Sequence, residues 1–585
     1  MNCNDAVYGN EYYDFIVTNN QYLPPVSEGI CTLDGGKDFA ILFVPSGDYP
    51  AMSVRNYAYN AIPKCYTPLS LEALDASGIL DVRDTPTLAL DGKGVLLGFL
   101  DTGIDTTHPA FLDENGNSRI VAVWDQNYRE VDAEMAEDPE SENAEVPGVY
   151  YGKVYSGNTL QQYGNGDTNG HGTYVASVAA GSARGDYSGA APGADIAMVH
   201  LKDAKAYLKD YYFIPQDRLC FQENDIMLGV QFLNALALQR NQPLVICMSL
   251  GSNMGSHSGN SPLGRYLNEI AALYRRCVVC GTGNEADKRH HAYGKFLKQE
   301  QLGISSPESE LISDSTGSAY IDVEIVVGDY GCSFILEQWS VAPNTFQIAL
   351  IAPSGEILPR ISIQLLTSQE FYFPIEGTRV MVDYSMPEAT TGNQLIYYRF
   401  KDPTPGIWRI RVFWQESGNG IFHMYLPQQE LQCEDVIFLS SNPDATVMEP
   451  GNAYRVLTFG GYRQRQNSLF LESGRGYALD GQLKPELVAP AVDVDGAVAG
   501  TNDRPEGLQY EARSGTSAAA AIGAGGAAMY MQWCERQMDY RVNTLQVKNF
   551  FIRGARTFPG DLYPNPRLGH GALDVYRSFE MLRNL

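Results

Sequence analysis

Three polar residues stand far apart in the chain in a pattern that can perform nucleophilic catalysis. Asp101 ends the apolar run "VLLGFLD", His171 stands in "GDTNGHGTYVA", and Ser517 stands in "ARSGTSAAAA". A serine hydroxyl is a weak nucleophile until an adjacent imidazole can accept its proton. A carboxylate on the other ring nitrogen fixes the tautomer and stabilises the imidazolium. The three residues could therefore form a catalytic triad for acyl transfer, in the chain order Asp, His, Ser.

Each of these residues also has a simpler interpretation when it is taken alone. Ser517 could cap the alanine-rich helix that follows it, because a serine hydroxyl accepts a bond from an orphan amide of the first turn. Asp101 could end a strand in a turn, and Asn284, in "GTGNEA", could be an ordinary loop residue. Asp105, close to Asp101, is expected to stabilise a turn rather than to catalyse. The occurrence of all the motifs together, in one order, favours the catalytic interpretation.

The apolar runs that lead to these residues indicate how the fold positions them. From about residue 65, short continuous apolar segments such as "DIAMVHL" and "LVICMSLG" alternate with helical patterns such as "NDIMLGVQFLNALALQR". Strands that are buried on both faces and alternate with helices indicate a doubly wound, mostly parallel sheet. In such sheets, functional residues gather at the carboxyl ends of the strands. The predicted fold class is therefore α/β, with Asp101 at the end of a strand.

Two other parts of the chain follow different patterns. Residues 1 to about 60 hold two strand-like runs, which predict a small α+β unit. Between about 310 and 430, short alternating segments punctuated by Gly, Pro and Asn predict an all-β, jelly-roll-like sandwich. The α/β pattern then resumes, so the β part interrupts the α/β domain. We therefore expect boundaries that divide the chain into residues 1–65, 66–309, 310–430 and 431–585.

The composition excludes several kinds of partner. The net charge of −27 over 585 residues and the pI near 4.7 argue against nucleic acid, whose phosphates would be repelled. No run approaches the roughly 18 uncharged apolar residues that span a bilayer, so no membrane span is expected. The start, "MNCNDAVYGNEYYDF", has neither the basic region nor the apolar core of a secretory signal peptide, so we expect synthesis in the cytoplasm.

The ten cysteines are spread from Cys3 to Cys534 and form no compact framework. In a long chain of this kind we expect them to be reduced and mostly buried. Cys277 and Cys280 form a C-x-x-C pair inside the apolar run "RRCVVCGTGN", which favours a core strand over a redox or metal pair.

One short segment has a spacing that could suit calcium. In "DENGN", Asp113, Asn115 and Asn117 stand at alternate positions. The segment lacks the following glycine and the distal glutamate of an EF-hand loop. A simple turn is the better interpretation, and we expect no metal and no other cofactor.

The motifs together resemble those of the subtilisin-like (S8) family of serine proteases. The segments "DTGID", "HGTYVA" and "GTSAAAA" match the three catalytic signatures of that family. Supporting segments, "SGAAPGADIAMV", "CMSLGS", "GTGNEA" and "KPELVAPAV", follow in family order. The resemblance covers about residues 65 to 300 and 440 to 580. Tyr174 stands where the family usually has a second histidine.

The resemblance implies a serine endopeptidase that acts on protein substrates. It implies that Asp101, His171 and Ser517 are catalytic, and that Asn284 is the side-chain donor of the oxyanion hole, together with the backbone N–H of Ser517. It assigns binding of an extended substrate backbone to Ser249, Leu250 and Gly251. It assigns the facing wall of the pocket for the residue before the cut to Gly281, Thr282 and Gly283.

The order of an N-terminal unit, a subtilase domain and a β insert resembles the Csp germination proteases of clostridial spores. That resemblance implies a prodomain that is cut autocatalytically and stays bound, with a junction expected between about Asn56 and Thr67. It also implies spore association and, as substrate, the zymogen of a spore-cortex lytic enzyme. We expect the protein to be a monomer.

The sequence leaves two other functions open. Some Csp relatives are pseudoproteases that act as sensors or scaffolds, although all three triad positions and Asn284 are present here. The β insert could also be a binding module that delivers the protease to glycan or protein, but an insert fold alone does not fix a function.

Overall fold

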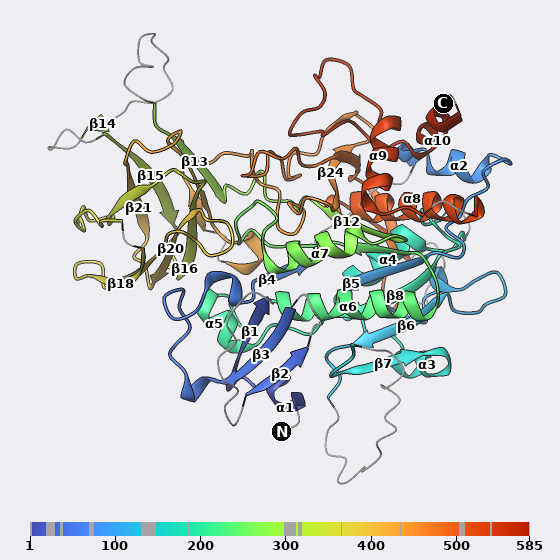
Figure 1. Cartoon of the computed structure of the whole chain (residues 1–585), viewed down its shortest axis with the longest axis horizontal. Helices are drawn as coiled ribbons and strands as arrows, with labels where there is room; N and C mark the ends of the chain where they lie inside the picture. The colour runs from blue at the N-terminus through green and yellow to red at the C-terminus, as the bar shows by residue number, and fades with distance from the viewer. Residues whose placement is uncertain are drawn as a thin grey trace.

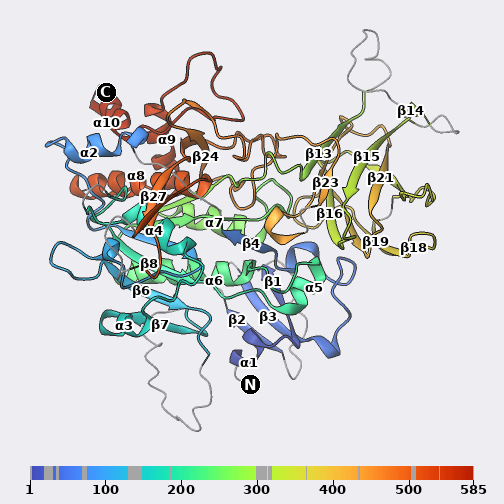
Figure 2. The same ribbon diagram turned by 180° about the vertical axis from the view of Figure 1, so that it is seen from behind.

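The computed structural model describes residues 3–18, 30–34, 39–68, 75–129, 148–184, 187–297, 312–313, 319–363, 365–432, 435–501, 509–538 and 541–583. Three parts are distinguishable in the ribbon: an α/β domain, a β-sandwich at one end of the molecule, and a small N-terminal unit that lies beside α5 and α6 (Figures 1 and 2). None of the helices in these ranges is long and apolar enough to cross a membrane.

A nine-stranded sheet forms the centre of the α/β domain. Its strands follow the order β25-β24-β12-β10-β5-β8-β6-β7, with β26 beside β24. All pairings are parallel except those of β6 with β7 and of β24 with β25. This sheet confirms the predicted α/β fold. The strands are β5 (Leu96–Asp101), β6 (Ile120–Asp125), β7 (Lys153–Ser156), β8 (Asp195–His200), β10 (Leu244–Met248), β12 (Arg276–Gly281), β24 (Leu457–Arg463), β25 (Ser468–Leu469) and β26 (Leu487–Pro490).

Helices cover both faces of this sheet. One core contains α4 (His171–Ala180) and α8 (Thr516–Arg536), and the other contains α6 (Glu223–Gln239) and α7 (Pro262–Ala272). Within β5, Leu97 and Phe99 belong to the first core, whereas Leu96 and Leu100 belong to the second. Burial on both faces explains why β5 is a continuous apolar run. The remaining helices and short strands of the domain are α2 (Ile79–Asp84), α3 (Leu160–Tyr163), α5 (Ala206–Tyr212), α9 (Thr544–Gly554), α10 (Val575–Arg583), β27 (Val494–Ala497) and β28 (Tyr510–Arg513).

Two antiparallel sheets form the sandwich. One follows the order β13-β22-β16-β20-β19-β18, and the other follows β14-β15-β21-β17 with β23 beside β15. Because β13 pairs with β22 and β23 pairs with β15, the sandwich extends beyond both ends of the expected range 310–430. The strands are β13 (His291–Lys295), β14 (Ile312–Ser313), β15 (Ala319–Val327), β16 (Phe334–Ser340), β17 (Phe346–Ile351), β18 (Leu366–Phe373), β19 (Thr378–Ser385), β20 (Gln394–Lys401), β21 (Gly406–Trp414), β22 (Ile421–Tyr425) and β23 (Val436–Phe438).

The N-terminal unit packs on the α/β domain through a three-stranded sheet. It consists of α1 (Cys3–Tyr8), β1 (Tyr12–Thr18), β2 (Cys31–Asp34) and β3 (Phe39–Pro45), in the strand order β1-β3-β2. A buried ion pair joins Asp14 of β1 to Lys205, with Oδ1 and Nζ 2.5 Å apart. The chain then leads to β4 (Cys65–Pro68), which lies between β9 (Phe221–Gln222) and β11 (Leu250–Gly251) in a separate small sheet.

The cysteines correct one expectation. Cys31 and Cys332 each take part in a disulfide bond, so the prediction of reduced cysteines is wrong for these two. Spacing along the chain does not show which thiols approach one another in space, and a disulfide depends on that approach. Cys277 and Cys280 are buried in β12, which confirms that they belong to a core strand. Cys220, Cys247 and Cys534 are also free and buried.

Candidate active site

Asp101 and His171 meet where β5 ends and α4 begins. His171 Nδ1 lies 2.7 Å from Asp101 Oδ1, and both residues are buried. The same carboxylate accepts bonds from the backbone N–H of Thr102 at 2.8 Å and from Ser249 Oγ at 2.9 Å. With three donors the carboxylate is fixed in place, and it holds the proton of His171 on Nδ1. The Nε2 atom is thereby left as the basic nitrogen.

A close approach of backbone segments brings this pair together. A Cβ atom on Gly172 would lie 2.1 Å from the carbonyl oxygen of Gly103 and 3.0 Å from Asp101 Cβ. No side chain fits there, so the glycine after His171 is required for α4 to begin against the end of β5.

Asp167 supports the loop before His171 and was not singled out from the sequence. Its Oδ1 accepts bonds from Gly170 N and Thr102 Oγ1, both at 2.8 Å. Its Oδ2 accepts bonds from the backbone N–H and the hydroxyl of Thr173 at 2.8 and 2.7 Å. Little in the sequence signals this role, because Gly170 and not Asp167 stands at the N-cap position of α4.

Ser517 is the second residue of α8, directly behind a glycine cap. Gly515 has a φ of 151°, and the run Ala518–Ala521 that follows the serine is fully buried. Ser517 itself is 0% exposed, although it stands at the start of a helix. The reason is that α8 packs along the sheet from its first turn, with its small residues against β10 and β12.

Ser249 connects the serine to the Asp–His pair. Its hydroxyl donates to Asp101, whereas its carbonyl oxygen lies 3.5 Å from Ser517 Oγ. The strand end that the sequence assigned to substrate binding therefore contacts two of the three expected triad residues.

Asn284 lies in the loop after β12, beside the start of α8. Its Oδ1 accepts the backbone N–H of Thr516 at 3.0 Å, and Thr516 Oγ1 accepts the backbone N–H of Gly283 at 3.1 Å. With Oδ1 occupied, the side-chain NH₂ group of Asn284 remains as a donor next to Ser517. Such a donor could stabilise an oxyanion.

A strand of this chain occupies the place that the sequence assigned to an extended substrate. β4 pairs antiparallel with β11, where Pro68 lies opposite Leu250 and Thr67 lies opposite Gly251. Its other edge pairs with β9, which the sequence analysis missed. Addition of a strand uses backbone hydrogen bonds, so the facing edge β9 carries no side-chain motif that could have revealed it.

Met448 lies between the two glycine-lined walls that the sequence predicted. A Cβ atom on Gly251 would be 3.2 Å from Met448 Cε, and one on Gly283 would be 2.1 Å from its sulfur. The backbone N–H of Met448 donates to the carbonyl of Thr282 at 3.0 Å. Met448 is buried, and its thioether fills the space between the walls. No sequence motif predicts this role of Met448. The residue follows the sandwich in the chain, whereas Gly251 and Gly283 precede it.

The sandwich contacts β11, which pairs with β4, and the residues that follow β11. Gln428 Nε2 donates to the carbonyl of Gly251 at 3.0 Å. Glu337 Oε2 accepts the backbone N–H of Gly255 at 2.9 Å, and its Oε1 accepts the hydroxyl of Tyr59 at 2.5 Å. Burial raises the pKa of this glutamate. One carboxylate of the sandwich thus joins the α/β domain to the N-terminal segment.

Other polar residues singled out earlier lie apart from the Asp–His pair or have structural partners. Asp105 accepts bonds from the backbone N–H and hydroxyl of Thr107 at 3.0 and 2.7 Å, and from Gly500 N at 2.9 Å. Asp113 Oδ1 accepts the N–H groups of Asn115 and Asn117, both at 2.8 Å, which forms a turn. In the described part of the chain, no group of three His, Cys, Asp or Glu residues could hold a metal ion.

A family model and a curated relative match parts of this chain. The subtilase family model matches residues 92–313 and 415–571, and these ranges contain the three expected triad residues and Asn284. The subtilisin-like protease SBT2.1 of Arabidopsis thaliana is 31% identical over 169 residues, which are 26% of this chain and only 20% of the plant protein. The match thus spans about a fifth of that relative's length.

Two solved structures extend the comparison. The CspB protease of Clostridium perfringens is 28% identical, with a TM-score of 0.71 over 87% of this chain and 97% of that chain. The epidermin leader peptide processing protease EpiP of Staphylococcus aureus is 13% identical, with a TM-score of 0.45 over 98% of this chain and 99% of that chain.

Proposed function

The chain belongs to the subtilase family of serine proteases, and we propose that it is a serine endopeptidase that uses Ser517, His171 and Asp101 as its triad. The observation that carries this proposal is the 2.7 Å contact between His171 and Asp101, which Ser249 connects to Ser517. The contact supports a histidine whose Nε2 can serve as a base.

The proposed reaction follows from these positions. Ser517 Oγ attacks the peptide carbonyl while its proton passes to His171 Nε2. The oxyanion accepts hydrogen bonds from the Asn284 NH₂ group and the Ser517 N–H. As the C–N bond breaks, His171 returns the proton to the leaving amine and an acyl-enzyme remains. Water then attacks the ester with the same base, which releases the acid and restores the hydroxyl. Asp101 holds the imidazolium throughout.

We further propose that the N-terminal unit is a prodomain, that the chain cuts itself, and that the sandwich is a jelly-roll-like insert. The pairing of β4 with β11 supports self-cleavage, because β4 is aligned as a substrate would be. Ser249, which directly precedes β11, has its carbonyl oxygen 3.5 Å from Ser517 Oγ. We therefore place the cut after Leu69, in a segment outside the described residues and slightly beyond the range expected from the sequence.

Covalent labelling with a fluorophosphonate tests the catalytic proposal. Ser517 Oγ should displace fluoride from phosphorus, and mass spectrometry of the digested protein should find the phosphonyl group on Ser517. The phosphonyl oxygen occupies the position of the oxyanion, so Asn284→Ala should label about 10²–10³-fold more slowly. An unchanged rate in Asn284→Ala would place the oxyanion hole elsewhere.

The same experiment separates the protease from a pseudoprotease that acts as a scaffold or sensor. A folded chain that takes up no label, although a known serine protease is labelled in parallel, would favour the scaffold. Circular dichroism on the same sample establishes that the unlabelled chain is folded.

For the physiological substrate, we propose limited proteolysis of a zymogen such as the precursor of a spore-cortex lytic enzyme, in a spore-associated setting. Similarity to the CspB protease supports this choice. Incubation of the two purified proteins should shorten the precursor at one bond, whereas the Ser517→Ala chain should leave it intact. An uncut precursor, in the presence of enzyme that reacts with the fluorophosphonate, would contradict this substrate but not the protease activity.

A further inference from the structure

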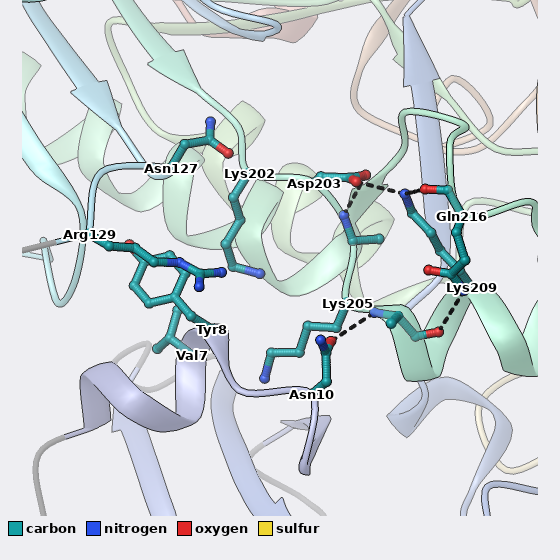
Figure 3. A pocket seen from close by; sticks show the side chains of 12 residues that line it. Val7, Tyr8, Asn10, Asn127, Arg129, Lys202, Asp203, Lys205, Lys209 and Gln216 are labelled. Carbon is teal, nitrogen blue, oxygen red and sulfur yellow. Dashed lines mark hydrogen bonds and ion pairs between the residues drawn. The ribbon is translucent and has the colours of Figure 1, made fainter. Parts of the chain in front are cut away.

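A cavity of about 270 Å³ lies at the seam between the N-terminal unit and the α/β domain. Tyr8 and Asn10 line it from the N-terminal unit, and Arg129, Lys202 and Lys205 line it from the α/β domain (Figure 3). Lys209 and Asp203 complete the charged lining. Four cations and one carboxylate therefore face this cavity, in a protein whose net charge is −27.

Two of the lysines are already committed to protein partners. Lys209 Nζ donates to Asp203 Oδ2 at 2.6 Å and to the carbonyls of Gln216 and Arg218 at 3.1 and 2.8 Å, which uses all three of its protons. Lys205 Nζ donates to the carbonyl of Ala6 at 2.6 Å and to the buried Asp14 at 2.5 Å. Lys205 therefore joins the N-terminal unit to the α/β domain, whereas Lys209 bonds within the α/β domain. Both lysines leave little capacity for a ligand.

Lys202 has unused capacity. It is buried, and its Nζ has one carboxylate neighbour, Asp225 Oδ2 at 2.6 Å. An ammonium group carries three N–H donors. In Figure 3, the ammonium of Lys202 points into the cavity, next to the guanidinium of Arg129.

Arg129 also lacks an acidic partner in the described residues. Its guanidinium lies 4.5 Å from the centre of the Tyr8 ring, a cation–π contact that leaves the planar N–H groups free to donate. Asn10 adds a third donor, because its Oδ1 accepts the backbone N–H of Ala206 at 2.9 Å and its NH₂ group remains. Two cations and an amide thus line one cavity, and Asp225 is the carboxylate that pairs with Lys202.

We propose that this cavity binds a small anion through a carboxylate or phosphate group. An anion in this cavity would accept charge-assisted hydrogen bonds from the remaining donors of Lys202 and from the guanidinium of Arg129. The volume lies below the roughly 300 Å³ at which sites for drug-sized ligands begin, so the ligand is a small molecule. The acidic surface of the protein repels larger polyanions.

The site would couple the anion to the docking of the N-terminal unit, since each part supplies donors. Asp14 Oδ2 also accepts Gln222 Nε2 at 3.0 Å, and Gln222 belongs to β9, which pairs with β4. A ligand that binds only the docked form stabilises that form by mass action. The anion should therefore strengthen the hold of the N-terminal unit; this consequence rests on the proposed prodomain, whereas binding itself does not.

Isothermal titration calorimetry of the full chain tests the site with inorganic phosphate and, in a separate arm, with citrate. Sodium chloride at equal ionic strength is the blank. We expect saturable binding of at least one of the two anions at one site per chain, and the two arms show whether phosphate or carboxylate is preferred. Arg129→Gln should weaken the binding about tenfold, because a hydrogen bond to a charged group is lost.

Arg129→Gln is preferred over a change at Lys202, which would leave the buried Asp225 unpaired and could prevent folding. The matched control is Arg379→Gln, which removes another exposed arginine that lies 5.4 Å from a tyrosine ring, in the sandwich. It should bind the anion as the unaltered chain does. The proposal is overturned if neither anion binds beyond the chloride blank. Equal binding by the unaltered chain and Arg129→Gln would also overturn it.

Discussion

Replacing Ser517 by alanine is expected to slow peptide hydrolysis about 10⁶-fold and to leave the chain as one uncut polypeptide. The nucleophile is lost, whereas the fold is not, because Ser517 is fully buried and alanine fits the same space. Within the described residues, the hydroxyl donates one hydrogen bond, which is long, at 3.5 Å to the carbonyl oxygen of Ser249. The loss of activity should therefore occur without a large fall in melting temperature.

Mass spectrometry of the purified chains measures the self-cleavage part of this prediction. The unaltered protein should give two fragments, because it is cut after Leu69, and Ser517→Ala should give one uncut chain. Ser468→Ala, at an exposed position of β25, is the control and should be cut normally. A cut Ser517→Ala chain, or an uncut unaltered chain that still hydrolyses peptides, would contradict self-processing.

The two fragments are expected to copurify because the contacts between them do not depend on the cut bond. Tyr59 bonds to Glu337 of the sandwich at 2.5 Å, and Asp14 pairs with Lys205 of the α/β domain at 2.5 Å. Both contacts are buried, and breaking a buried charged contact by removing one partner costs several kcal/mol, about 3–5. Gel filtration should therefore give one peak that contains both fragments.

Asp101→Asn is expected to lower kcat about 10⁴-fold and to change KM little. The asparagine keeps the shape of the side chain, but its NH₂ group can donate to His171 Nδ1. The imidazole is then held in the wrong tautomer, with its proton on the nitrogen that should act as the base. Steady-state kinetics on a peptide substrate measures both constants.

Asp105→Asn is the matched control, because it makes the same change in the same sequence signature. Asp105 bonds to Thr107 and Gly500 and not to His171, so kcat should stay within about threefold, as for a substitution with a structural role. Equal losses of kcat in the two variants would show that Asp101 acts through the stability of the loop and not through the imidazole.

Much of the α/β domain could be predicted from local patterns. The continuous apolar runs mark strands that are buried on both faces, and β5, β8, β10 and β12 form where these runs stand. The glycine after His171 and the alanines after Ser517 likewise reflect close backbone approaches, which only small residues permit. Apolar runs and small residues can be seen in the sequence itself, even where the segments that they pack against are distant along the chain.

The boundaries of the sandwich and the disulfide bonds were not predictable in this way. β13 lies more than a hundred residues from its partner β22, and its five residues give no sign of that pairing. Cys31 and Cys332 look like any other cysteine in a long chain. The pairing of β13 with β22 is decided by the packing of the whole domain, and a disulfide bond likewise depends on how segments approach in space.

The amino-acid sequence determined which side chains could perform chemistry and which strand and helix ends present Asp101, His171 and Ser517. The tertiary structure alone decided that Ser517 is buried, that Met448 fills the space between two glycine walls, and that β4 lies between β9 and β11. The physical reason is that triad chemistry requires particular side chains, which a sequence displays. Strand addition uses backbone groups, and the contact between the N-terminal unit and the α/β domain uses charged side chains. The partners of both are decided only when distant segments pack together.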